Sequence, residues 1–263
     1  MRTLLPVLVL MLSACGGGGG GGSGSAAPPI LPPPVDADPS GLWVGSLAFD
    51  DQTFADLVGI VTADGRFTLV SVDTFGPDTA GQYVGMATVS GTDLTGTGSA
   101  YAAAGATWGN GATVIDFSFT AVIVERNSLT GTWQSGDGAS GSFDMQYDTE
   151  YEKDSTLTLL EGVWFVYDDI LNPTLTLTMD AGGAFTAQSS FGCQSLGQAS
   201  IIDANFNVYA WDVTITTCPI QGDYSGFAVL GDIDTGDPNN SQNNAILVTF
   251  SNDQRALLLA LER

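Results

Sequence analysis

The fold of this chain is constrained most by a strict alternation of apolar and polar residues that recurs along its length. At 174–179, threonines alternate with leucines and a methionine, and 115–123 and 209–216 repeat the pattern with aromatic and β-branched residues. Successive side chains of a strand point to opposite faces of a sheet, so this alternation is typical of strands with one buried face. Because we find no convincing segment with a helical period, we predict an all-β protein.

Short turns rich in glycine, aspartate and asparagine separate the alternating segments. Asp64-Gly65 and Gly182-Gly183 are two of them, and such pairs favour tight turns between antiparallel strands. Strands spaced about 8–12 residues apart indicate an antiparallel sandwich or barrel. We count about eight strand-like segments in each half, which begin near Trp43, Leu57, Phe67, Tyr83, Leu94, Val114, Leu129 and Ser142, and near Trp164, Leu175, Phe185, Gln198, Val208, Tyr224, Ala245 and Ala256.

The two halves read as copies of one unit. Gly41-Leu42-Trp43 opens the first half and Gly162-Val163-Trp164 opens the second, and residues 63–68 are echoed by 181–186. Eight short strands joined by tight turns can close into an up-and-down barrel, which leaves no exposed sheet edge. We therefore predict two tandem antiparallel β-barrels at 41–148 and 161–263, joined by a linker at 149–160. A single β-sandwich of similar length is the alternative.

The Gly-x-Trp openings are similar to the first strand of the calycins, the lipocalin-type barrels. That resemblance implies a late arginine that covers the opening tryptophan. Arg255 or Arg263 could do so in the second half, whereas the first half offers no arginine later than Arg126. The second half also resembles a domain of uncharacterised proteobacterial lipoproteins, a likeness that brings no known activity; it is carried by Gly192-Cys193, Asn207-Val208-Tyr209, Val213, Cys218 and residues 222–226.

The start of the chain has the features of a secretory signal. A positive charge and an apolar run at 4–12 precede small residues and Cys15, and the run is too short to span a bilayer, which needs roughly 20 apolar residues. Leu12-Ser13-Ala14-Cys15 resembles the lipobox of bacterial lipoproteins. The resemblance implies a signal peptide at 1–14, cleavage before Cys15 and lipidation of that residue with fatty acyl chains such as palmitate. Because Gly16 follows instead of an aspartate, the resemblance also implies the outer membrane.

A tether is expected between the lipidated cysteine and the barrels. Residues 16–22 are all glycine, and prolines recur between 28 and 39. Glycine-rich segments behave as flexible coils and proline-rich ones as semi-rigid extended spacers. We therefore assign 15–40 to the lipidated cysteine and a tether that holds the folded body away from the membrane.

The two remaining cysteines, Cys193 and Cys218, are an even pair in an exported chain, which suggests a disulfide. Residues 203–207 look like a hairpin turn. Their centre lies close to the midpoint between the cysteines, so we expect Cys193 and Cys218 to face each other across the ladder. With two cysteines and no histidine, the body lacks the usual four ligands of a structural zinc site.

The charge balance is strongly acidic. The chain has 29 acidic and 6 basic residues, no histidine and a formal net charge of −23. Such a body repels phosphate backbones and anionic lipid surfaces, so we predict no binding to nucleic acid. The acidity either serves solubility or attracts cations or a basic partner.

The sequence offers no recognisable catalytic machinery. Without histidine, Ser-His-Asp and Cys-His arrangements are ruled out. Lys153, the sole lysine, lies beside Glu150, Glu152 and Asp154, which keep it protonated and make it a poor base. No nucleotide-binding glycine motif is present. We therefore expect neither enzymatic activity nor a cofactor.

Two weaker candidates for a binding site remain. Asp232, Asp234 and Asp237 lie in an oxygen-rich loop at 231–240 and are calcium candidates, although a solvated hairpin loop has the same composition. The second candidate is an apolar cavity inside a barrel, whose alternative is an interior filled by side chains. It would be lined by Trp43, Trp164, Tyr209, Trp211 and Phe227, whereas Trp108 and Trp133 are expected to be more exposed and to mark a protein contact.

Two functional hypotheses follow from these features. The first is a non-catalytic outer-membrane lipoprotein, anchored to the membrane by its lipid, that binds or scaffolds another envelope protein. The second is a carrier that holds a small apolar ligand inside a β-barrel. The sequence does not indicate whether the body faces the periplasm or the cell exterior.

Overall fold

The computed structural model describes residues 35–50, 54–72, 81–169, 172–232 and 243–263 of the chain. The predicted signal peptide, Cys15 and most of the predicted tether therefore lie outside the described residues. Within these ranges, no helix is long and apolar enough to cross a bilayer.

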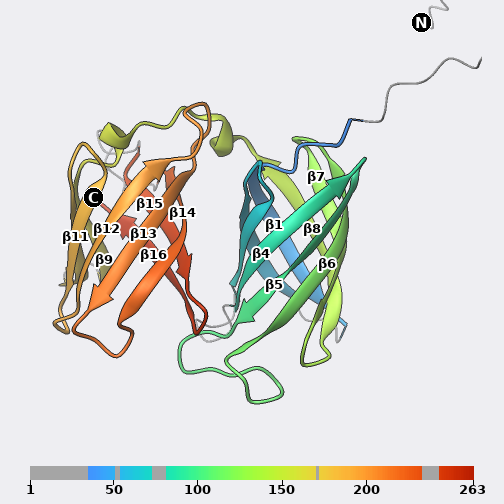
Figure 1. The fold of residues 1–263 in the computed structure, drawn as a ribbon, viewed down its shortest axis with the longest axis horizontal. Coiled ribbons are helices and arrows are strands. Elements are labelled where there is room, and N and C mark those ends of the chain that lie inside the picture. Colours follow the sequence, from blue (N-terminus) through green and yellow to red (C-terminus); the bar gives the residue numbers. More distant parts are fainter. Residues whose placement is uncertain (1–34, 51–53, 73–80, 170–171, 233–242) are drawn as a thin grey trace, which may run out of the picture. The chain divides into compact units, whose positions relative to one another are not determined.

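The first half of the body forms a closed antiparallel barrel in which each strand pairs with the next and β1 pairs with β8 (Figure 1). Alternating burial along β6, where every second residue is buried, follows directly from the alternation in the sequence. The strands are β1 (Gly41–Phe49), β2 (Phe54–Val61), β3 (Arg66–Val72), β4 (Gly81–Ser90), β5 (Asp93–Tyr101), β6 (Val114–Val124), β7 (Ser128–Ser135) and β8 (Ser140–Asp148).

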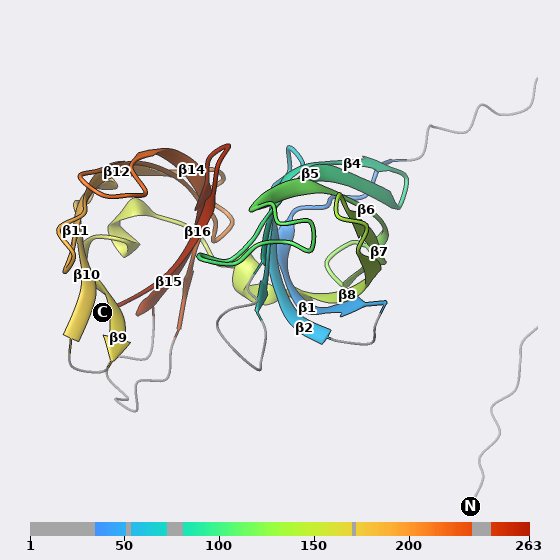
Figure 2. The ribbon, with the colours of Figure 1, turned by 90° about the horizontal axis from the view of Figure 1, so that it is seen from below.

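The second half forms another eight-stranded antiparallel barrel, in which β9 pairs with β10 and with β16. Figure 2 shows the strands of each barrel arranged as a ring. The strands of the second barrel are β9 (Gly162–Asp169), β10 (Asn172–Met179), β11 (Ala184–Ser189), β12 (Gln194–Ile201), β13 (Tyr209–Thr216), β14 (Gly222–Gly231), β15 (Ala245–Ser251) and β16 (Ala256–Glu262).

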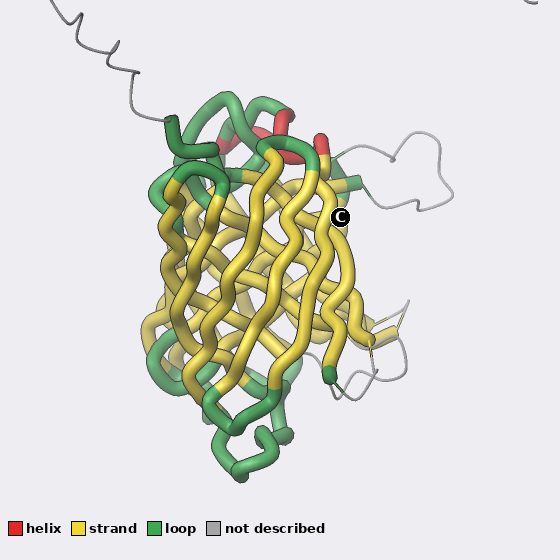
Figure 3. Tube along the Cα trace, turned by 90° about the vertical axis from the view of Figure 1, so that its right-hand side faces the viewer, coloured by secondary structure: helices red, strands yellow, loops and turns green. Residues whose placement is uncertain are grey.

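These observations confirm the prediction of two tandem barrels, and the single β-sandwich was wrong. Every predicted strand start lies within an observed strand except Val208, which immediately precedes β13. The short 3-10 helices η2 (Thr149–Glu152) and η3 (Leu157–Leu159) occupy the stretch between the barrels. Figure 3 shows the helical segments near the ends of the strands.

The repeated turn has the same geometry in both barrels. Gly65 and Gly183 have φ angles of +84° and +82°, in the left-handed region that glycine adopts without steric cost. The carbonyl of Gly65 accepts a hydrogen bond from Ala87 N at 2.7 Å, and that of Gly183 accepts one from Ala199 N at 2.8 Å. The sequence repeat therefore encodes one turn that is used twice.

The opening tryptophans are also equivalent, but different residues cover them. Nε1 of Trp43 donates to Pro39 O at 3.2 Å, and Nε1 of Trp164 donates to Leu160 O at 2.8 Å. The Arg263 guanidinium lies over the Trp164 ring, 4.3 Å from its centroid, as the calycin resemblance implies. In the first barrel, Tyr147 packs edge-on against Trp43 with ring centroids 5.4 Å apart.

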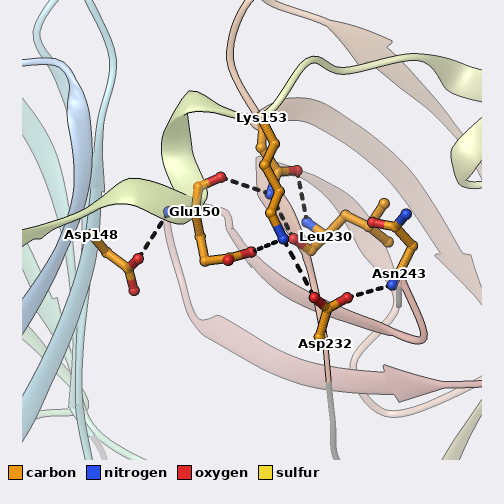
Figure 4. A network of polar contacts seen from close by, with 7 residues as sticks. Asp148, Glu150, Lys153, Leu230, Asp232 and Asn243 are labelled. Carbon is orange, nitrogen blue, oxygen red and sulfur yellow. Dashed lines mark hydrogen bonds and ion pairs between the residues drawn. The ribbon is translucent and has the colours of Figure 1, made fainter. Parts of the chain in front are cut away.

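Polar contacts attach the segment between the barrels to its neighbours (Figure 4). The Asp148 carboxylate caps η2 by accepting from Glu150 N at 2.9 Å. Lys153 forms ion pairs with Glu150 at 2.6 Å and with Asp232 at 3.4 Å. Tyr151 is buried, and its ring stacks on Phe206 at 4.8 Å between centroids. The predicted linker at 149–160 is therefore an ordered part of the body.

Candidate functional site

The second barrel contains an apolar cavity of about 290 Å³. Its wall is made mainly of side chains that point inward from β10, β11, β13, β15 and β16. None of the described residues that line it carries a charge. The residues that line the cavity include Leu175, Ala187, Ser195, Trp211, Ile215 and Leu259.

Small side chains explain why this space is not filled. Ala187 on β11 and Ser195 on β12 both line the cavity, and their Cα atoms pair across the ladder between the two strands. An alanine or serine at an inward position leaves room that a larger side chain would take. Interiors normally leave few voids larger than a water molecule, so a cavity of this size is a feature that calls for a function.

The end of the barrel at the start of β9 is packed closed. Trp164, Tyr209 and Leu160 are fully buried there, and Leu157 and Leu159 of η3 pack against the same core. The Tyr209 hydroxyl donates to Thr156 O at 3.3 Å, and burial raises the pKa of this phenol. The cavity therefore extends toward the opposite end of the barrel.

A disulfide between Cys193 and Cys218 lies at that opposite end, with the two Cα atoms 5.1 Å apart. The predicted pairing of the cysteines is thus confirmed, but the expected register was wrong by one residue. Gln194 pairs with Thr216 at the last step of the ladder between β12 and β13, so the register would bring Thr217 opposite Cys193. Thr217 has a φ of +61°, and this left-handed residue redirects the chain after β13 has ended.

Two hydroxyl groups of the cavity wall have hydrogen-bond partners within the protein. Thr174 Oγ1 donates to Val166 O at 3.1 Å, and Ser189 Oγ accepts from Cys193 N at 3.1 Å. Both hydroxyls thus take part in bonds within the protein. The wall can bind apolar matter well, and it offers no compensation for burying a charge.

The strand pairing around the cavity is interrupted at one place. Ladders of five or more residue pairs join the other neighbouring strands of this barrel. Among the described residues, β9 and β16 are joined by the single pair Phe165 and Glu262. The equivalent ladder between β1 and β8 in the first barrel has eight pairs, from Leu42 with Asp148 to Phe49 with Gly141.

A larger depression of about 690 Å³ lies elsewhere on the second barrel. Asp212, Thr214 and Asp223 line it, and these residues alternate with buried ones along β13 and β14, so they face outward. It is an open polar surface, and Thr214 Oγ1 already donates to the Asp223 carboxylate at 2.6 Å. The enclosed apolar cavity is the better candidate site.

The predicted cavity aromatics have different locations. Trp211 lines the cavity, whereas Trp43, Trp164 and Tyr209 are packed core residues. Phe227 belongs to another apolar cluster, which includes Tyr151, and the expectation that it lines a barrel was wrong.

The expected exposure was wrong for Trp133, whereas Trp108 is partly exposed. Trp133 is 4% exposed inside the first barrel, and Trp108 packs against that core and donates from Nε1 to Ala100 O at 3.1 Å. Trp133 therefore offers no exposed aromatic surface of the kind that was expected to mark a protein contact.

The calcium candidates are not brought together by the described part of the chain. The Asp232 carboxylate pairs with Lys153 and accepts a hydrogen bond from Asn243 N (Figure 4), while Asp234 and Asp237 lie outside the described residues. Within the described ranges, no three histidine, cysteine, aspartate or glutamate residues group as metal ligands.

Comparison with protein-family models, curated proteins and solved structures gives no match for this chain.

Proposed function

We propose that this protein binds a small apolar ligand in the cavity of its second barrel. The observation that carries the proposal is the uncharged, largely apolar wall around about 290 Å³ of partly enclosed space. This volume is at the lower end of the range of roughly 300–1,000 Å³ for sites of small molecules. Of the two functional hypotheses, the geometry favours the carrier.

The contrast with the first barrel supports this proposal. Ten aromatic side chains pack in or against the core of the first barrel, and six do so in the second. An apolar cavity stays dry. Filling it with an apolar ligand is favourable, because apolar surface of the ligand is removed from water. A cavity retained in one of two equivalent barrels is consistent with a binding role for that barrel.

The test is titration of the full chain with apolar probes, including single-chain fatty acids, with the fluorescence of the cavity residue Trp211 as readout. Ala187→Phe places a ring in the cavity and should weaken binding by about 100-fold or more, since little space remains. Thr186→Phe on the same strand faces outward and is the matched control, because Thr186 is exposed.

Native mass spectrometry of gently purified protein adds an independent readout of bound species. The proposal fails if the wild-type chain binds none of the probes and carries no bound molecule. It also fails if Ala187→Phe, shown to be folded by circular dichroism, binds as tightly as the wild type.

We further propose that Cys15 anchors the body to the outer membrane as a lipoprotein. The support is the lipobox-like Leu12-Ser13-Ala14-Cys15 directly after an apolar signal core. Two or more acyl chains anchor a protein stably, whereas one gives marginal binding. Labelling of the exported chain with a palmitate analogue should fail for Cys15→Ser, and labelling of that variant would contradict the proposal.

The hypothesis that the body scaffolds another envelope protein stays a prediction. Crosslinking in cells, followed by capture of the chain, should then trap one specific envelope protein. A clean negative result across envelope fractions would count against it.

A further inference from the structure

The cavity is too small for a whole lipid, and its wall excludes a charge. A volume of about 290 Å³ accommodates about ten methylene-sized groups, at roughly 30 Å³ for a group the size of water. A charged or strongly polar group inside would lose its hydration without gaining a partner of opposite charge. A ligand with such a group must therefore keep it outside the barrel.

The end of the barrel near the disulfide is held by covalent and polar contacts. Cys193 and Ile220 pack against the core there, and the disulfide ties the turn before β12 to the loop after β13. The Tyr224 hydroxyl donates to Ile220 O at 2.7 Å, and Gln221 N donates to Cys218 O at 3.0 Å. These contacts restrain the loop at this end, where the cavity-lining Phe191 is exposed.

The seam between β9 and β16 has no comparable restraint. The Phe165–Glu262 pair is the ladder between these strands in the described residues, and the later part of β9 and the earlier part of β16 lack ladder pairs with each other. Breaking one pair costs far less than breaking a full ladder, so the strands can separate here while the other ladders stay intact.

The cavity is bordered at this seam by an exposed residue of β16. Along β16, Leu257, Leu259 and Leu261 point inward, while Leu258 points outward and is 38% exposed. Leu258 nevertheless lines the cavity together with Val166 of β9. The lining of the cavity thus includes the edge of β16 at the seam, besides the exposed Phe191 at the disulfide end.

Exposed apolar side chains flank the outer side of the seam. On β9, Val163 is 43% and Tyr167 is 41% exposed, and the rings of Phe165 and Tyr167 lie 5.7 Å apart. With Leu258 on β16, they make the exterior next to the opening apolar. A hydrocarbon chain that passes through the seam would thus remain in apolar contact on both sides of it.

We infer that the cavity binds one hydrocarbon chain of an amphiphile, and that this chain passes in and out through the seam between β9 and β16. The polar end of the amphiphile stays outside at the seam. The net charge of −23 disfavours an anionic polar end, so a zwitterionic or neutral one fits best. This inference rests on the proposed function, because it requires the cavity to be the ligand site.

The test closes the seam with a crosslink. Continuing the register from Phe165 and Glu262 brings Tyr167 opposite Ala260, and both are exposed. In the full chain, Tyr167→Cys/Ala260→Cys is oxidised to a disulfide, which peptide mapping verifies beside the native one. Thr178→Cys/Thr186→Cys is the matched control, because these exposed residues already pair across the ladder between β10 and β11.

The probe is a single-chain zwitterionic lipid with about ten chain carbons, to match the cavity, and stopped-flow fluorescence follows its binding. The crosslinked seam should slow association and dissociation by about tenfold or more, with little change in Kd, because opening limits passage and the cavity itself is intact. The control crosslink should leave both rates unchanged.

A second measurement does not depend on the crosslink. The same lipid with a nitroxide on its polar end should quench a fluorophore at Tyr167→Cys more strongly than one at Phe191→Cys, which lines the cavity in the turn at the disulfide end. Wild-type rates in the crosslinked protein, or quenching at Phe191 alone, would overturn the seam as the route while leaving the cavity as the site. Failure of the wild type to bind any apolar probe would overturn both proposals.

Discussion

The two barrels share a topology and an opening motif, but they use their interiors differently. In the first barrel, Phe67, Phe119 and Phe143 pack edge to face with ring centroids 5.2 and 5.8 Å apart. In the second, Ala187 and Ser195 border open space. The comparison teaches that strand number alone does not decide whether a small barrel is solid. What decides it is whether large side chains across the barrel fill the space left by small inward residues.

The barrels also close differently. The first is sealed by eight residue pairs between its first and last strands, and the second by one among the described residues. The β9–β10 ladder is also irregular, with register shifts on both sides of Pro173, and proline cannot donate a ladder hydrogen bond. The hollow barrel is thus also the barrel with a weak seam.

The largest expected effect tests the difference in packing. Phe119→Ala removes a ring from the filled barrel and should cost about 3–5 kcal/mol of the free energy of unfolding. Phe250→Ala in the second barrel removes a ring that borders the cavity. It should cost at least about 1 kcal/mol less, because the side of the ring that faces a void has fewer partner atoms to lose.

Hydrogen exchange separates the two barrels in this measurement, with the amides of β6 reporting on the first and those of β15 on the second. Thr120→Ala is the control, because Thr120 is exposed and neighbours Phe119 on the same strand. Equal costs for the two phenylalanines would mean that the cavity does not weaken the packing around Phe250.

The next effect concerns the disulfide, which only the second barrel has. Cys193→Ala/Cys218→Ala removes a crosslink between residues 25 positions apart and should cost about 3 kcal/mol by the chain-entropy argument. Amide exchange should rise in the second barrel while the strands of the first keep their protection. If the hollow barrel does not depend on this crosslink, the double variant will exchange like the wild type.

The alternation in the sequence was sufficient to predict the strands and both barrels, because in a strand the side-chain period directly reports which face is buried. The alternation could not identify the buried face of a strand in which both sets of alternate residues are apolar. In residues 226–230 of β14, Ala228 and Leu230 face the barrel core, while Phe227 and Val229 belong to another cluster. Period alone could not tell these two faces apart.

The cavity and the seam could not be predicted from local sequence. Ala187 and Ser195 are ordinary strand residues in sequence, and they leave a void only because of what lies opposite them across the barrel. The register error at Thr217 has a similar origin, since threonine rarely adopts a positive φ. The calycin resemblance of the Gly-x-Trp motif implied a late arginine over Trp164 and left Arg255 and Arg263 open, and the structure shows that it is Arg263.

The smallest expected effect tests how the two opening tryptophans are covered. Burial, with the nearby Glu152 carboxylate, raises the pKa of Tyr147 from its ordinary 10.0 to about 12. The folded state therefore keeps its proton when the unfolded state has lost it. The contribution of Tyr147 to stability is fully present below pH 10 and is lost as the pH rises toward 12.

Tyr147→Phe should flatten part of this loss of stability between pH 10 and 12, as measured by urea unfolding at each pH. Glu152→Gln keeps the phenol but removes the neighbouring negative charge, so it should lower the pKa of Tyr147 and make the loss of stability above pH 10 smaller. Because Trp164 is covered by Arg263 instead, exchange in β9 should respond to neither substitution. A pH dependence that is the same in wild type, Tyr147→Phe and Glu152→Gln would show that the cover over Trp43 does not titrate in this range.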